Sequence, residues 1–109
     1  EPDFGYNAIR IPLYLIRAGI TDPQLLAPYT QAWRRGAATG LQLVNVKSNQ
    51  TIANLTDPGY RILAAALACA TDETPVPNEL KLFTPTHYYP SALYLLTFSY
   101  LVERHAECL

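Results

Sequence analysis

Phe4 to Leu15 reads Phe-Gly-Tyr-Asn-Ala-Ile-Arg-Ile-Pro-Leu-Tyr-Leu, and this stretch decides how the rest of the chain is interpreted. It places a glycine-aromatic turn and a polar pair before a wholly apolar helix body. Asn7 and Arg10 stand at positions i and i+3, so on a helix they face the same side near its N-terminal end. That end carries free backbone N–H groups and partial positive charge, which favour a polar or anionic group. The pattern fits either a binding site or an ordinary capped helix start with Arg10 in solvent.

Four helices are predicted from start signals and apolar spacing. The Asp-Pro pairs at 22–23 and 57–58 each combine a capping side chain with a residue whose φ is already helical. Pro12 interrupts the first helix and should kink it. The expected helices cover residues 6–18, 23–35, 58–71 and 90–107, with a further short helical turn within 78–83.

The apolar patterns predict which faces are buried. On the second helix, one buried face is expected from apolar residues at helical spacing, namely Leu25, Leu26, Tyr29, Ala32 and Trp33. The third and last helices are apolar around most of their circumference, which predicts burial on several sides. Between the second and third helices, alternating apolar residues over 41–53 flank a Lys47–Gln50 turn and predict a short β-hairpin.

The run from Gly5 to Leu15 resembles the Tyr-Asp-Ala-x-Arg-x-Pro helix start of glycoside hydrolase family 8, the inverting endoglucanases, chitosanases and xylanases built on an (α/α)6 barrel. Within that family, the chain looks most like the cellulases that accompany bacterial cellulose synthesis. The resemblance continues through shorter motifs at 21–23, 44–46, 57–60 and 88–92, and so covers nearly all of the chain but only the C-terminal part of such an enzyme. It implies an all-α fold in which residues 1–109 form a single, incomplete domain, the C-terminal part of the barrel with a short β-hairpin insertion.

The resemblance also implies a chemistry, and one residue departs from it. Inverting glycosidases use a carboxylic acid and a carboxylate base that lie roughly 6.5–9.5 Å apart. In the family, the acid is a Glu on an early barrel helix outside this chain, and the base is the Asp of the motif. Asn7 occupies that position here, and an amide cannot accept a proton from water near neutral pH. Asp3 and Asp57 are left as candidates for the base, although each is also explained as a lead-in charge or a helix cap.

The remaining site residues follow from the same resemblance. It implies that Tyr6, Arg10 and Tyr88 bind the glucan and that His87, beside Tyr88, borders the sugar cleft. The alternative for the last two is that they are loop residues at the edge of the solvent. For Asn7, the implied role is to hold the attacking water or a sugar hydroxyl.

The two cysteines do not predict a metal centre. Cys69 and Cys108 lack a Cys-x-x-Cys spacing, and His105 with Cys108 on the predicted last helix supplies only two ligands. Cys69 lies in an alanine-rich run and fits a small buried apolar residue, while a disulfide with Cys108 stays open if the protein is exported. We therefore expect no metal and no cofactor.

Charge and hydrophobicity limit the partners. The net charge of −1 gives no reason to bind nucleic acid, and no apolar run reaches the ~18 residues of a membrane span. Half of the residues are hydrophobic and only 16% are charged, which predicts apolar faces that need a partner. The resemblance implies a periplasmic or secreted bacterial protein whose partners are β-1,4-glucan, the remaining N-terminal part of the barrel and the cellulose synthase machinery. Three functions stay open: a glucanase segment, an inactive β-glucan-binding protein and a small helical interaction module.

Overall fold

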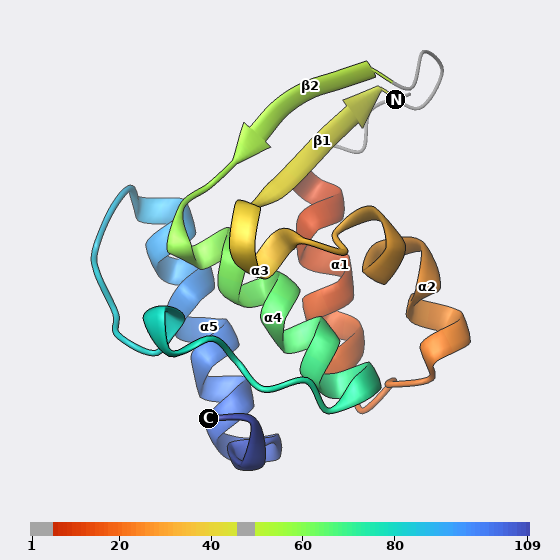
Figure 1. Cartoon of the computed structure of the whole chain (residues 1–109), viewed down its shortest axis with the longest axis vertical. Helices are drawn as coiled ribbons and strands as arrows, with labels where there is room; N and C mark the ends of the chain where they lie inside the picture. The colour runs from red at the N-terminus through yellow and green to blue at the C-terminus, as the bar shows by residue number, and fades with distance from the viewer. Residues whose placement is uncertain (1–5, 46–49) are drawn as a thin grey trace.

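Residues 6–45 and 50–109 are described by the computed structural model of the chain, which is built mainly from helices (Figure 1). In chain order, the elements are α1 (Tyr6–Arg17), α2 (Pro23–Ala32), α3 (Gly36–Thr39), β1 (Leu41–Asn45), β2 (Gln50–Leu55), α4 (Pro58–Asp72), the 3-10 turn η1 (Asn78–Leu80), α5 (Tyr88–Arg104) and the 3-10 turn η2 (Ala106–Cys108).

Helix α4 is the centre of the fold, and α1, α2, α3 and α5 all pack against it (Figure 1). Every side chain over 62–67 is buried, as the alanine-rich apolar sequence predicts. The small side chains let neighbouring helices approach closely. Gly36 of α3 shows how closely, because a Cβ atom there would overlap the Cβ atom of Ala64.

Helix α5 is less buried than the sequence predicts. Leu93, Tyr94 and Leu101 face the core, but about half of the side-chain surface is exposed at Leu96 and Val102. The molecule is 21 Å thick at its thinnest, roughly two helix diameters, so α5 packs on α4 and keeps its other side open. The prediction of burial around most of this helix is therefore wrong for the chain as described.

The last helix also begins and ends earlier than predicted. It starts at Tyr88 rather than Pro90 and ends at Arg104, where the N–H of His105 donates to the carbonyl oxygen of Leu101. His105 leaves the helical conformation and η2 follows as a separate turn. His105 and Cys108 therefore do not share one α-helix.

The second helix ends at Ala32 rather than near Arg35. Leu26 and Trp33 are buried as predicted, but Leu25 is 62% exposed and Ala32 is also exposed. The chain turns after Trp33, and α3 then begins at Gly36. Gly36 lies directly against Ala64 of α4.

The predicted hairpin region forms two antiparallel strands. β1 pairs with β2 from Leu41 opposite Leu55 to Asn45 opposite Gln50, with a register shift after Leu43. Gln50 therefore belongs to a strand and not to the turn, and the second strand runs beyond 53 to Leu55. Residues 46–49, which include most of the predicted turn, lie outside the described part of the chain.

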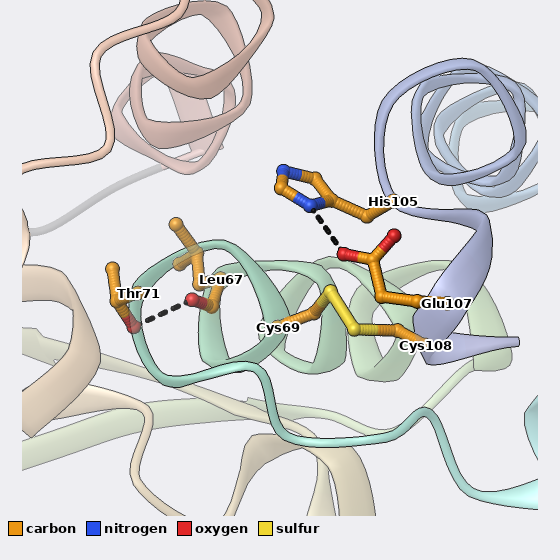
Figure 2. Close-up of a disulfide and its surroundings, with 6 residues drawn as sticks. All are labelled: Leu67, Cys69, Thr71, His105, Glu107 and Cys108. Atoms are coloured by element: carbon orange, nitrogen blue, oxygen red, sulfur yellow. Dashed lines mark hydrogen bonds and ion pairs between the residues drawn. A yellow bond between two sulfur atoms is a disulfide. The ribbon is translucent and has the colours of Figure 1, made fainter.

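A disulfide joins Cys69 of α4 to Cys108 of η2, which decides between the two alternatives for these cysteines (Figure 2). The backbone N–H of Val76, in the loop after α4, donates to the carbonyl oxygen of Cys108 at 2.8 Å and ties that loop to η2 as well. Beside the disulfide, the hydroxyl of Thr71 donates to the carbonyl oxygen of Leu67 at 2.7 Å. The last residues of the chain are thus fixed to the C-terminal half of α4.

Within the described residues, none of the helices has both the length and the apolar character required to cross a bilayer.

Candidate functional site

The candidate site is a pocket of about 360 Å³ where α4 and α5 begin. It brings a carboxylate, an imidazole and two phenol rings to one place. Its lining residues are Leu55, Thr56, Asp57, Tyr60, His87, Tyr89 and Pro90. This combination can bind a sugar, because aromatic faces pack on apolar ring surfaces and the polar groups exchange hydrogen bonds with hydroxyls.

A glycine fixes the two helix starts against each other. A Cβ atom on Gly59, in the first turn of α4, would overlap the backbone carbonyl oxygen of Pro90 in the first turn of α5. Only glycine fits at so close an approach of two backbones. The rings of Tyr60 and Tyr89 consequently lie near one another, with centroids 6.2 Å apart and planes inclined by 42°.

Tyr89 connects this pocket to the first half of α1. Burial raises the pKa of the Tyr89 phenol, the Arg10 guanidinium opposes that shift, and Tyr14 adds to it. The phenol oxygen of Tyr89 is buried and has no hydrogen-bond partner among the described residues. Tyr89 of this pocket therefore lies within electrostatic reach of Arg10 and Tyr14 on α1.

The structure describes the side chains of only some of the predicted site residues. Arg10 is exposed on α1 within electrostatic reach of Tyr89. Tyr88 is the first residue of α5 rather than a loop residue, and 89% of its surface is exposed. The side chains of Tyr6 and Asn7, like Asp3, lie outside the described part of the structure, so their predicted roles stay predictions.

Two residues that were only candidates now share the pocket. His87 holds the N-cap position of α5, and Asp57 holds that of α4. Tyr60 and Tyr89 were not predicted as site residues. The sequence signal for Tyr60 is its neighbour Gly59, because a glycine in the first turn of a helix often marks a close contact with another backbone. No comparable signal marks Tyr89.

A second polar cluster lies at the opposite ends of α4 and α5. Nδ1 of His105 and Oε2 of Glu107 are 3.0 Å apart above the disulfide (Figure 2), and this hydrogen bond lowers the pKa of Glu107. The ligand atoms of Cys69, Glu107 and Cys108 lie within 4.8 Å of one another. Both sulfurs are bonded to each other, so neither can act as a thiolate ligand.

A larger hollow of about 410 Å³ lies between α2 and α4 and is lined in part by Ala37, Ala64 and Ala68. Its lining holds one aromatic residue, Trp33, whereas the pocket at the helix starts holds Tyr60, Tyr89 and the imidazole of His87. The pocket at the helix starts is therefore the better candidate for a sugar site.

Comparison with known proteins gives one informative match. A protein from Novacetimonas hansenii named "Probable endoglucanase" is 34% identical to this chain over 99 residues. The chain is similar to part of an endoglucanase. The aligned region makes up 89% of this chain but only 28% of the relative, so the chain spans less than a third of that protein's length. No family model matches the chain, and no solved structure matches it.

The match includes most of the chain, so the pocket and the elements that build it belong to an endoglucanase-like segment. A glycosidase site needs carboxyl groups, and Asp57 is the carboxylate that lines this pocket.

Proposed function

We propose that this chain is the C-terminal segment of an inverting endo-β-1,4-glucanase of glycoside hydrolase family 8 that hydrolyses cellulose-type glucan. The observation that carries the proposal is the 34% identity over 99 residues to a protein named as an endoglucanase. The Tyr6-Asn7-Ala8 motif followed by Arg10 supports the assignment to this family. The pocket at the starts of α4 and α5, whose Tyr89 lies within electrostatic reach of Arg10, supports a glucan site there.

In this proposal, the chain supplies one wall of the cleft. The general acid is a Glu in the part of the protein that lies outside this chain. Arg10 and Tyr6 contact the glucan, and the exposed ring of Tyr88 stacks on a pyranose at the rim. Asn7 holds a water or a sugar hydroxyl by hydrogen bonds and does not remove a proton.

Exposed apolar side chains on α1 and α5 support an incomplete (α/α)6 barrel. They are Ile11, Tyr14, Leu95, Leu96 and Val102. Large apolar side chains that lie together on helix surfaces are typical of faces that a partner covers. The proposed partner is the remaining N-terminal part of the barrel, and the whole enzyme would work beside the cellulose synthase machinery.

The disulfide between Cys69 and Cys108 supports an exported protein. Disulfides persist in the bacterial periplasm and outside the cell, whereas the cytosol keeps thiols reduced. We therefore assign the protein to the periplasm or the extracellular medium, where β-1,4-glucan is also found.

Asn7 supports a second candidate, a β-glucan-binding protein without catalysis. The residue stands where the family's base is an Asp, and a cleft that lost its base would still bind sugar through its aromatic and polar groups.

Reducing ends released from carboxymethyl-cellulose by the full-length protein separate the two candidates. The glucanase proposal predicts steady release, whereas binding of the polymer without release would favour the inactive binding protein. Neither binding nor release would contradict both. The isolated 109-residue chain should release nothing, because it lacks the general acid.

A further inference from the structure

Asp57 differs from the other aspartate that opens a helix before a proline. Asp22 caps α2 in the usual way, since its carboxylate accepts the N–H of Gln24 at 2.9 Å. Asp57 has nearly the same φ, −61° against −60°, and the same extended backbone conformation, but its side chain makes no capping hydrogen bond. The carboxylate of Asp57 therefore does not make the capping hydrogen bond that the Asp-Pro sequence predicts.

That carboxylate lies in the pocket at the starts of α4 and α5. Asp57 is half-buried and lines the pocket with Thr56, Tyr60, His87 and Tyr89. A general base needs a carboxylate that lies in the binding pocket and is not engaged in a structural hydrogen bond or ion pair.

The ionic surroundings leave the carboxylate available. Arg61 is the basic residue one turn further along α4, but its Nη2 pairs with Oε1 of Glu79 at 2.9 Å and its Nε donates to the carbonyl oxygen of Ala37. Among the residues that the structure describes, Asp57 forms no ion pair. The titratable residues that line the pocket with it are His87, Tyr60 and Tyr89.

One residue of the site is also within electrostatic reach of α1, the helix that carries the family-like motif. Tyr89 lines the pocket and lies within electrostatic reach of Arg10 on α1. The phenol oxygen of Tyr89 is buried and has no hydrogen-bond partner among the described residues. A glucan that contacts Arg10 would therefore pass close to the pocket that holds Asp57.

We propose that Asp57 is the carboxylate that accepts the proton of the attacking water, the task that Asn7 cannot perform; this rests on the proposed glucanase function. In the step, the water oxygen forms a bond to the anomeric carbon while a proton of that water passes to the carboxylate of Asp57. The glycosidic C–O bond breaks, and the leaving oxygen takes its proton from the carboxylic acid in the part of the protein outside this chain.

The test compares Asp57→Asn with Asp22→Asn in the full-length protein. Asparagine is as good an N-cap as aspartate, so both variants keep their helix starts. We expect Asp57→Asn to lower the turnover of carboxymethyl-cellulose by about 10²–10⁴-fold, the usual contribution of a general base. Its affinity for cellopentaose should stay near the wild-type value. Asp22→Asn should keep wild-type turnover, because its carboxylate lies outside the pocket.

Azide provides a readout that a structural role would not produce. In Asp57→Ala, azide can attack the anomeric carbon without a base, and it should restore cleavage and give an α-glycosyl azide. Three results would overturn the inference: wild-type turnover in Asp57→Asn, loss of cellopentaose binding together with turnover, or an inactive Asp57→Ala that azide does not restore. If the unmodified full-length protein fails to cleave the polymer, the proposed function itself fails.

Discussion

A single buried hydroxyl gives the clearest expectation at the scale of residues. Thr97 is fully buried in α5, and its Oγ1 has no hydrogen-bond partner among the described residues. Burying an unpaired hydroxyl costs roughly 1–3 kcal/mol in proteins. We expect Thr97→Val, which puts a methyl group in place of the hydroxyl, to raise the free energy of unfolding by about 1 kcal/mol in urea denaturation.

Tyr94→Phe is the matched control on the same helix. The phenol of Tyr94 is buried and donates to the carbonyl oxygen of Leu80 at 2.6 Å, so its removal leaves that acceptor without a partner. This variant should lose about 1–2 kcal/mol of unfolding free energy. A loss of stability in Thr97→Val of the same size would contradict the interpretation of the unpaired hydroxyl.

At the scale of elements, the disulfide holds η2 against α4. Cys69 and Cys108 are 39 residues apart in sequence. Closing a loop of that length restricts the unfolded chain by an amount equivalent to about 4 kcal/mol, and measured effects are often smaller. We expect reduction of the disulfide to lower the free energy of unfolding by about 2–4 kcal/mol, measured as a shift of the urea midpoint.

The double substitution Cys69→Ser with Cys108→Ser is the control for this experiment. It should be destabilised as much as the reduced protein and should not respond to added reductant. An oxidised and a reduced protein with equal midpoints would show that the cross-link does not stabilise the fold.

Two helix starts follow from local sequence, whereas the start of α5 and the ends of α2 and α5 do not. The Asp-Pro pairs at 22–23 and 57–58 mark two helix starts correctly because capping and proline geometry act within one turn. The ends at Ala32 and Arg104 were predicted too late. The first is determined by the contact of Gly36 with α4 and the second lies next to the segment held by the disulfide, and both contacts join residues distant in sequence.

The candidate site also contains some residues that the sequence points to and others that it does not. Arg10 and His87 were named from the family resemblance, and their roles in binding stay predictions. Tyr60 and Tyr89 were missed because only the close approach of Gly59 to Pro90 brings them together. No local pattern indicates that the Asp57 carboxylate makes no capping hydrogen bond. Asp22 has the same Asp-Pro sequence, and its carboxylate does make one.

At the scale of the whole molecule, the chain corresponds to 28% of a protein named as an endoglucanase. Its site lies where α4 and α5 begin, beside α1, and exposed apolar side chains remain on α1 and α5. These features agree with a chain that is similar to one part of a longer, endoglucanase-like protein.

The most direct test is the anomer that the full-length protein first releases from cellopentaose, followed by proton NMR of the anomeric signals. An inverting enzyme attacks the β-linked carbon from the opposite face, so the account predicts that the α-anomer appears first and then mutarotates. Release of the β-anomer first, or intact cellopentaose after prolonged incubation with folded protein, would contradict it.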